Sequence, residues 1–356
     1  MYQIYTKSKM TTKKTKAVCA PLIEAEHLRR ALRERNLLRD DVEIAKEGTY
    51  ICFPVKDASE DLCLYKVVTK SFKLKAAKPH CYKDRLKLPK KLMEELPTSY
   101  DVVGAIILIK LPKTLFHYRK EIGKALLETH KNIRTVCLID PVSGELRTRN
   151  VAIIAGENQT LTTHTEYGLL FDVDVRTTYF SPRLTSERKR VADLVKPGET
   201  VVDMFAGVAP FSIMIARYAK PRIVYAIDKN KEAVILAQQN AKQNHVLETV
   251  EVIHADANDV EKVVPKKADR IIMNLPFSAY RFFSLALSIA AKTCIVHYYD
   301  ILKEEDIDAR IDALKKIAEE QYFNLKDISI RKIKSYAPRE FYIGIDITAT
   351  KHADVA

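Results

Sequence analysis

The C-terminal half of the chain contains a turn of small residues with an acidic side chain about twenty residues beyond it. The turn lies within Val201-Val-Asp-Met-Phe-Ala-Gly-Val-Ala-Pro210, where a predicted strand runs into a predicted helix. Small residues at such a junction let a ligand approach the backbone closely. Asp228, at the end of the next predicted strand, can accept hydrogen bonds from both hydroxyls of a ribose. The pair predicts a cofactor that contains a nucleoside, which is true of both NAD and S-adenosylmethionine.

Two more polar segments follow the third and fourth predicted strands. In His254-Ala-Asp256-Ala257 the carboxylate can accept a hydrogen bond from the amino group of adenine, although an Asp at this position can also simply cap a helix. In Asn274-Leu-Pro276-Phe277 the amide can orient a planar nitrogenous acceptor beside a sulfonium, although a Pro turn can also merely end a strand. The second segment favours a methyltransferase over a dehydrogenase.

These segments need a sheet that holds them at one edge, and the sequence from Ser186 onward predicts one. Apolar strands alternate there with amphipathic helices, which is typical of a parallel sheet covered by helices on both faces. Strands are expected at residues 200–203, 223–227, 250–254, 270–273 and 294–299, with a closing pair at 328–335 and 341–348.

The N-terminal part reads as two smaller α/β units. Residues 1–16 are rich in Lys, Ser and Thr and are expected to form a flexible basic tail. The first unit is expected to contain a helix at 25–34 and strands at 42–44 and 50–55. The second is expected to contain a helix at 117–129 and strands at 102–109, 135–138, 149–155, 161–163, 169–175 and 178–180.

The charge of the chain points to a polyanionic partner. Lys and Arg number 59 against 46 acidic residues, a net charge of +13. Residues 70–91 hold eight Lys and one Arg against the single Asp84, so they are expected to form an exposed basic linker with a net charge of +8. Such a linker can hold RNA phosphates or can be only a solvated hinge.

Cysteine usage and hydropathy favour a cytoplasmic, soluble protein. The six cysteines form no CxxC pair and have no His-rich neighbourhood, so free buried thiols are expected and no metal site is predicted. The longest strongly apolar stretch, Val102–Ile109, is too short to cross a bilayer, and no signal-peptide core follows the basic N-terminus.

Five motifs together closely resemble the archaeal and eukaryotic tRNA (guanine-37-N1)-methyltransferases, over roughly residues 17–350. The motifs are Tyr179-Phe-Ser-Pro-Arg-Leu184, Asp203-Met-Phe-Ala-Gly-Val-Ala-Pro-Phe-Ser212, Asn274-Leu-Pro276, His297-Tyr-Tyr299 and Ser335-Tyr-Ala-Pro-Arg339. The chain departs from the family at Ala209, where these enzymes usually have Gly.

The resemblance implies a Rossmann-like class I methyltransferase domain at 186–356 that follows two smaller α/β domains. The first of these, 17–69, would check the shape of the tRNA, and the second, 70–185, would comprise the basic linker and a middle RNA-binding domain. The implied cofactor is S-adenosylmethionine and the implied partner is tRNA, bound by a monomer. The target base must be flipped out of the anticodon loop, which favours anchoring contacts elsewhere on the RNA.

The resemblance also assigns residues. Guanine N1 carries a proton, so its methylation needs a base at N1 and positive charge near O6. Glu187 would be the base and Arg147 would stabilise the charge on O6, with Arg149 as the alternative if the loop register differs. Asn274 would help hold the guanine, and Phe180 would help line the pocket. The implied cofactor residues are Tyr179, Arg188, Asp203, Phe205, Gly207, Asp228, Asp256, Ala257, Asn274 and Pro276.

Other functions remain open at this point. Some archaeal members of the resembling family also methylate a tricyclic wyosine precursor at the same tRNA position. The Asn274–Phe277 segment also looks like the Asn-Pro-Pro-Tyr loop of enzymes that methylate exocyclic amines. An RNA-binding protein with a relic cofactor fold is a further alternative. A pyrimidine carbon-5 methyltransferase is disfavoured, because that reaction needs a thiolate and no Cys follows a Pro beside the fourth strand.

Overall fold

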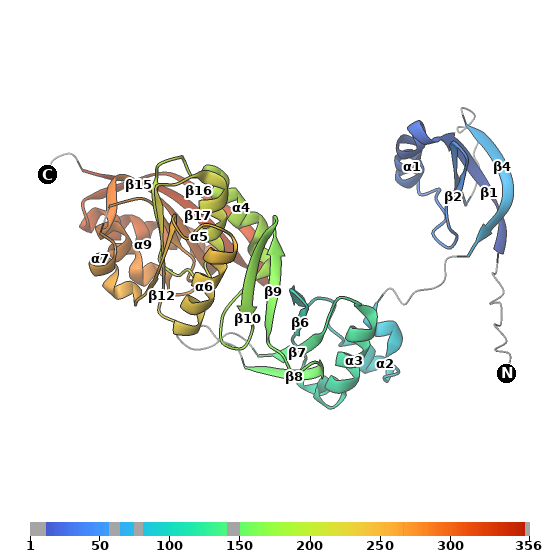
Figure 1. Cartoon of the computed structure of the whole chain (residues 1–356), viewed down its shortest axis with the longest axis horizontal. Helices are drawn as coiled ribbons and strands as arrows, with labels where there is room; N and C mark the ends of the chain where they lie inside the picture. The colour runs from blue at the N-terminus through green and yellow to red at the C-terminus, as the bar shows by residue number, and fades with distance from the viewer. Residues whose placement is uncertain (1–11, 57–64, 75–80, 141–149, 266, 353–356) are drawn as a thin grey trace. The chain divides into compact units, whose positions relative to one another are not determined.

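The computed structural model describes residues 12–56, 65–74, 81–140, 150–265 and 267–352 (Figure 1). The chain divides into two compact units, Met1–Asp84 and Arg85–Ala356. In the described part of the chain, no helix is long and apolar enough to cross a membrane.

The first unit is a four-stranded sheet in the order β2-β3-β1-β4 with one helix. Its elements are β1 (Thr12–Pro21), η1 (Leu22–Glu24), α1 (Ala25–Glu34), β2 (Ala45–Glu47), β3 (Tyr50–Pro54) and β4 (Lys66–Lys73). Leu28 and Leu32, one turn apart on α1, are buried against Val18 and Phe53 of the sheet. The helix therefore forms where its apolar positions recur at the α-helical period.

Strand pairing moves two of the predicted boundaries. β1 begins at Thr12, so the flexible tail predicted for residues 1–16 is wrong for residues 12–16. β4 continues to Lys73, so the first domain passes its predicted end at residue 69 and the predicted linker begins inside a strand. The reason is that β4 also contributes the buried side chain Phe72 to the core. The backbone hydrogen bonds between β1 and β4 offset the entropy lost when these Lys-rich segments become ordered.

Cys19 and Cys52 form a disulfide bond, which corrects the prediction that the cysteines are free thiols. The two residues are direct partners in the antiparallel register of β1 and β3. Their sequence separation of 33 does not indicate this pairing, because the register depends on the whole sheet. Cys137 and Cys294 are free and buried, as expected.

The second unit starts with a small sheet in the order β5-β6-β7-β8. Its elements are η3 (Tyr82–Arg85), α2 (Lys90–Glu94), β5 (Asp101–Val103), β6 (Ile106–Ile109), η4 (Lys113–Tyr118), α3 (Arg119–Thr129), β7 (Thr135–Ile139) and β8 (Val151–Gly156). The single strand predicted at 102–109 is wrong, since the chain reverses between β5 and β6. Gly104 has φ +52° in this turn, and its N–H donates to His164 Nδ1 at 3.1 Å.

A hairpin of β9 (Leu161–Glu166) and β10 (Leu169–Asp174) packs onto the C-terminal domain. Side chains of α6 (Lys231–Gln243) and its C-cap hold it there. Asn240 Oδ1 accepts the N–H of Asp172 at 2.7 Å, and Asn244 Oδ1 accepts that of Leu170 at 2.9 Å. The hairpin thus shares a core with the domain predicted to begin at residue 186. Residues 178–180, expected as a strand, are not one.

The C-terminal domain contains a seven-stranded sheet in the order β13-β12-β11-β14-β15-β17-β16, with β17 antiparallel to both of its neighbours. The strands are β11 (Thr200–Asp203), β12 (Ile223–Asp228), β13 (Val250–His254), β14 (Ala268–Met273), β15 (Ala290–Lys303), β16 (Phe323–Ala337) and β17 (Glu340–Lys351). This order confirms the predicted Rossmann-like class I methyltransferase domain and brings the ends of β11, β12, β13 and β14 to one edge.

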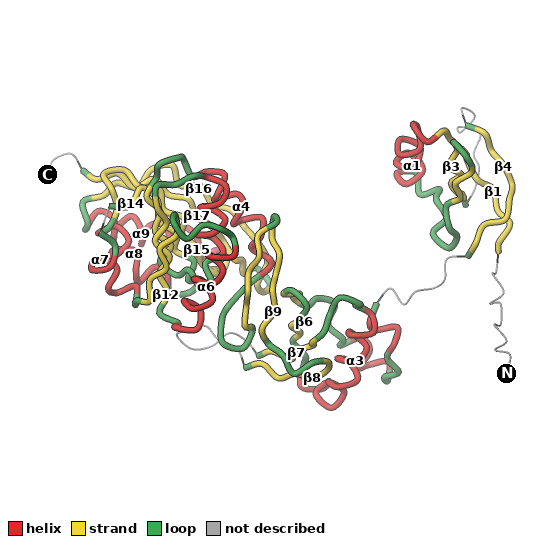
Figure 2. The backbone as a smooth tube through the Cα atoms, in the orientation of Figure 1, coloured by secondary structure: helices red, strands yellow, loops and turns green. Residues whose placement is uncertain are grey.

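Helices cover the sheet on both faces, and Figure 2 shows the strands between two helical layers. One buried cluster joins the sheet to α4 (Thr185–Leu194), α5 (Pro210–Ala219) and α6. A second joins it to α7 (Val260–Val263), α8 (Phe283–Ser288) and α9 (Ile307–Glu320). Short 3-10 turns complete the domain at η5 (Pro182–Leu184), η6 (Ala257–Asp259), η7 (Ala279–Phe282) and η8 (Glu304–Asp306).

Candidate active site

The loop between β11 and α5 is shaped by two residues in the left-handed region. Gly207 has φ +56° and Ala209, the N-cap of α5, has φ +61°. The N–H of Gly207 donates to Asp228 Oδ2 at 2.6 Å, and the N–H of Asn230 donates to Asp228 Oδ1 at 2.9 Å. The loop backbone therefore fixes the carboxylate predicted to bind a ribose.

Two buried carboxylates lie at this loop. Burial raises the pKa of Asp203 to about 7, because the hydrogen bonds from the Ser212 hydroxyl (2.9 Å) and the Phe205 backbone offset only part of the desolvation. Burial also raises the pKa of Asp228, against the N–H groups of Asn230 and Gly207. A cationic ligand such as S-adenosylmethionine would stabilise the ionised form of both carboxylates, whereas a dinucleotide diphosphate would disfavour it.

Asp256 lies at the same edge, because His254 pairs with Asp228 in the register of β13 and β12. Its Oδ1 caps η6 by accepting the N–H of Asn258 at 2.9 Å, and its Oδ2 lies 3.1 Å from Lys229 Nζ. The N–H of Asn258 is the main cause that lowers its pKa. The helix-cap role of Asp256 is thus present, and the adenine contact predicted for Asp256 and the buried Ala257 stays a prediction.

Phe205 lies in the loop, and Tyr179 lies next to it. The carbonyl oxygen of Tyr179 is 3.6 Å from the position of a Cβ at Gly207, which is an ordinary contact distance, so the positive φ of Gly207 is what favours glycine there. The ring of Phe205 packs edge-on against Phe282 with centroids 5.2 Å apart. Both residues predicted to bind the cofactor are therefore part of this loop or adjoin it.

Arg188 lies beneath the loop in a closed environment. It is 2% exposed, forms an ion pair with the buried Glu166, donates to the Ser181 carbonyl at 2.8 Å and lies over the ring of Phe180. These contacts fix the segment that leads into α4. Arg188 is therefore held by the protein itself, and its predicted contact with the cofactor stays a prediction.

The loop after β14 is held by buried groups. The hydroxyl of Tyr342 donates to Asn274 Oδ1, so the amide NH₂ is the end of Asn274 left to face an acceptor. The N–H of Phe277 donates at 2.8 Å to Asp300, a fully buried carboxylate that also accepts from the Tyr298 hydroxyl at 2.6 Å. These hydrogen bonds therefore hold the segment 274–277, which includes Pro276, in place.

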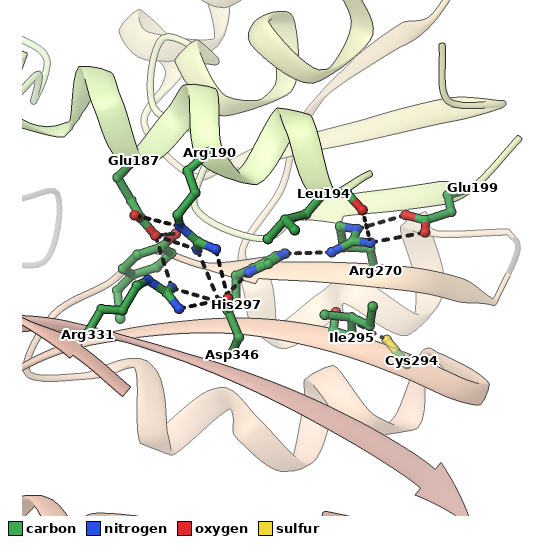
Figure 3. Close-up of polar contacts among 11 residues, drawn as sticks. Glu187, Arg190, Leu194, Glu199, Arg270, Cys294, Ile295, His297, Arg331 and Asp346 are labelled. Carbon is green, nitrogen blue, oxygen red and sulfur yellow. Dashed lines mark hydrogen bonds and ion pairs between the residues drawn. The ribbon is translucent and has the colours of Figure 1, made fainter. Parts of the chain in front are cut away.

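Glu187, the predicted base, is 8% exposed on the first turn of α4 (Figure 3). Arg190 binds both of its oxygens at 2.7 and 2.9 Å, and Tyr299 Oη and Arg331 donate to Oε1 at 2.8 and 3.3 Å. Burial raises the pKa of Glu187, but hydrogen bonds from Arg190 and Tyr299 and the charge of Arg331 outweigh it. The net pKa is lowered, so the carboxylate is ionised at neutral pH.

Asp346 anchors both arginines from the other side. Its oxygens accept from Arg190 and Arg331 at distances between 2.9 and 3.2 Å, as Figure 3 shows. Burial opposes ionisation of Asp346, but the hydrogen bonds from His297, Arg331 and Arg190 hold its pKa well below the usual range. Glu187 and Asp346 thus share two cations, which fixes the position of Glu187.

The network continues through His297 to Arg270. His297 Nδ1 lies 2.6 Å from Asp346 Oδ1, and Nε2 lies 2.8 Å from Arg270 Nη1. Arg270 can only donate, so Nε2 accepts and Nδ1 carries the proton that it donates to Asp346. Burial lowers the pKa of His297, which keeps the ring neutral. Arg270 ends the network at Glu199, with contacts of 2.7 and 3.0 Å.

Glu187 and Asn274 are brought together by two tyrosines. The Tyr299 hydroxyl donates to Glu187, and the Tyr342 hydroxyl donates to Asn274. The centroids of the two tyrosine rings are 6.2 Å apart. Tyr299 also lies 5.7 Å from Phe211, which follows the cofactor loop in α5. The predicted base and the predicted acceptor-holding residue are therefore linked through two packed tyrosine rings, one of which packs on the helix that follows the predicted cofactor loop. Arg147 and Arg149 lie outside the described residues.

Sequence reasoning missed the partners of Glu187. Arg190 follows it by three positions, a spacing that places both on one helix face and could have been read. Asp346 interrupts the apolar strand Ile343–Ile347, which also marks a charge that needs a buried partner. Arg331 and Tyr299 meet Glu187 only through long-range strand order.

Three family descriptions match the chain in order. Residues 18–63 match the tRNA methyltransferase 5 N-terminal domain, residues 82–160 match the TYW2 N-terminal domain, and residues 162–326 match the TRM5/TYW2 methyltransferase domain.

Individual proteins agree with these matches. The tRNA (guanine(37)-N(1))-methyltransferase Trm5b of Pyrococcus abyssi is 38% identical over 334 residues, which cover 93% of this chain and 98% of that protein. A tRNA(Phe) (4-demethylwyosine(37)-C(7)) aminocarboxypropyltransferase of Methanocaldococcus jannaschii is 33% identical over 249 residues, 70% of this chain and 96% of that protein. The solved complex of aTrm5 and tRNALeu has a TM-score of 0.68 and 35% identity, covering 94% of this chain and 99% of its own.

The predicted family and cofactor are confirmed, and the enzyme class is that of S-adenosylmethionine-dependent methyltransferases. Identity over nearly the whole length of a relative, the matching sheet order and the cofactor loop together show that this chain belongs to the TRM5/TYW2 methyltransferase family.

Proposed function

We propose that this chain transfers the methyl group of S-adenosylmethionine to N1 of guanosine 37 in tRNA, with Glu187 as the base. The observation that carries the proposal is an ionised, buried carboxylate that is linked to Asn274 through the packed rings of Tyr299 and Tyr342. An exocyclic amine needs no such base, so this carboxylate favours attack by ring N1.

The residues divide the chemistry between them. The cofactor supplies an electrophilic methyl group on its sulfonium. Glu187 accepts the N1 proton, and its Oε2 is the better placed oxygen, because it accepts from Arg190 alone while Oε1 accepts from three donors. The Asn274 amide orients the guanine edge. Arg147 is our proposal for the charge that develops on O6.

The share of this chain that each relative matches favours guanosine 37 over a wyosine precursor as the substrate. The match to the guanosine-37 methyltransferase extends over almost its entire length, including the N-terminal domain. The tRNA 4-demethylwyosine(37)-methyltransferase Taw21 of Saccharolobus solfataricus is 28% identical and matches only 70% of this chain. The tRNA complex of a neighbour supports tRNA as the partner of this chain. We propose that it acts as a monomer.

Identification of the product tests the proposal. Purified protein is incubated with labelled S-adenosylmethionine and unmodified tRNA carrying G37, and with a matched A37 transcript, followed by nucleoside digestion and mass spectrometry. N1-methylguanosine in the G37 transcript alone is the expected result. An N2-methylated guanosine, or equal labelling of the A37 transcript, would contradict it. Transfer only to tRNA carrying the wyosine precursor would assign the alternative substrate.

A further inference from the structure

Two exposed aromatic rings meet beside the acceptor side of the site. Phe277, in the loop after β14, is 48% exposed, and Tyr336, near the end of β16, is 53% exposed. Their centroids are 5.7 Å apart with an interplanar angle of 74°. The two rings, here called the aromatic corner, thus present both a ring face and a ring edge to a planar group.

Backbone irregularities create this arrangement. Phe277 has φ +70°, a conformation unusual for a bulky residue, and buried Asp300 holds it by accepting its N–H. Tyr336 is the extra residue of a β-bulge, because Ser335 pairs with Phe341 and Ala337 pairs with Glu340. Strain and bulges of this kind persist where the surroundings enforce them, and they are frequent beside functional sites.

The position of the corner indicates what it binds. Phe277 follows Asn274 by three residues, and Tyr342, which binds Asn274, carries Lys334 of β16 over its ring at 5.1 Å. Exposed Arg339 lies in the turn just after Tyr336. Exposed aromatic rings with nearby cations are the combination that binds single-stranded nucleic acid, the rings by stacking and the cations through phosphates.

We propose that the aromatic corner stacks one unpaired base of the tRNA anticodon loop that adjoins the target guanosine. The inference rests on the proposed function, because it takes the RNA from there. Flipping the target base breaks its stacking with its neighbours, and the corner provides a new stacking partner for one of them. Phe277 and Tyr336 are therefore RNA-binding residues outside the reacting centre.

The test uses tRNA with 2-aminopurine at position 36 or 38, whose fluorescence is quenched by stacking. The variants are Phe277→Leu and Tyr336→Leu, with Phe277→Tyr as the conservative replacement. The matched control is Tyr322→Leu, because Tyr322 is also exposed (58%), has φ +59° and lies at the opposite end of β16. Affinity for tRNA, affinity for S-adenosylmethionine and thermal stability are measured for each full-length protein.

In the saturated complex, we expect the wild type to quench one of the two positions, and each Leu variant at the corner to lose that quenching. We expect the Kd for tRNA to rise about tenfold in these variants, with unchanged cofactor affinity. Phe277→Tyr and Tyr322→Leu should behave as the wild type does.

Equal fluorescence of wild type and corner variants at both positions overturns the proposal, whether or not tRNA affinity changes. The same wild-type samples are assayed for N1-methylguanosine. If none forms, the proposed reaction fails, while the quenching still reports on the corner.

Discussion

Asp203 and Glu187 are both buried carboxylates near the same edge of the catalytic sheet, but their surroundings are opposite. Asp203 receives hydrogen bonds from a hydroxyl and a backbone N–H, and burial raises its pKa to about 7. Glu187 is bound by Arg190 and Arg331, and its pKa is lowered. Within one fold, burial thus gives one carboxylate that holds a proton readily and one that stays charged.

The cofactor side and the acceptor side of the site are built in different ways. The cofactor side is made from a local turn and the N–H groups of Gly207 and Asn230. The acceptor side is made from side chains of α4, β15, β16 and β17, which strand order brings together. A charge fixed by several long-range partners is suited to accept a proton in a set direction.

Removing the charge of Glu187 should have the largest effect. Glu187→Gln keeps the shape and removes the base, so we expect kcat to fall about 10²- to 10⁴-fold while tRNA affinity stays within a few-fold. Single-turnover rates and equilibrium binding measure the two quantities. Asp193→Asn, on the exposed part of the same helix, serves as the control and should keep full activity. Equal losses in both variants would contradict a specific role for Glu187.

Arg190→Gln should shift the pH dependence of the reaction. Arg190 is the main group that lowers the pKa of Glu187, so its loss raises that pKa and moves the acidic limb of kcat/KM to higher pH. We also expect a loss of about 1–3 kcal/mol in stability, since Asp346 loses a partner as well. The control is Lys189→Gln, which removes a surface charge next to it. If the acidic limb of the kcat/KM profile lies at the same pH in Arg190→Gln as in the wild type, Arg190 does not set the pKa of the catalytic base.

Asp203→Asn should change the pH dependence of stability and not the charge of the base. The folded pKa of Asp203 is raised to about 7 from 3.8, so wild-type stability from this group is complete below pH 4 and declines as the pH rises to 7. The variant lacks this titration. The free energy of unfolding of the variant should therefore rise relative to that of the wild type from pH 4 to pH 8, by up to about 4 kcal/mol for a shift of about 3 pKa units. A constant difference across this range would show that Asp203 is ionised throughout.

Ala209→Gly should have the smallest effect. Ala209 has φ +61°, which costs an L-residue about 1 kcal/mol, so Gly should raise Tm by about 1–3 °C. The greater freedom of Gly in the unfolded chain offsets part of this gain. Lys220→Gly is matched, because Lys220 has φ +52° at the other end of α5. A lower Tm in Ala209→Gly alone would mean that the Ala methyl group contributes packing that outweighs its strain.

The sequence predicts local features well and long-range ones poorly. The strands 200–203 and 250–254 and the helix 25–34 are as predicted, because apolar periodicity and turn residues mark them. The turn at Gly104 was missed, because an unbroken apolar run hides a chain reversal.

The same limit applies to the site. Gly207 and Asp228 meet as their spacing predicts, since they belong to one β-α-β unit. Asp346 contributes to the position of Glu187 although the two lie 159 positions apart in the sequence. Neither this contact nor the Cys19–Cys52 bond can be inferred before the strand register is known.

The most direct test of the account follows the methyl group to position 37. Wild type and Glu187→Gln are each saturated with S-adenosylmethionine and G37 tRNA, and the nucleoside at position 37 is identified over a single turnover. We expect the wild type to form N1-methylguanosine. We expect the single-turnover rate of Glu187→Gln to be at least about 100-fold lower, at equal occupancy of both substrates. N1-methylguanosine formed at the same rate by both proteins would contradict the claim that Glu187 removes the N1 proton.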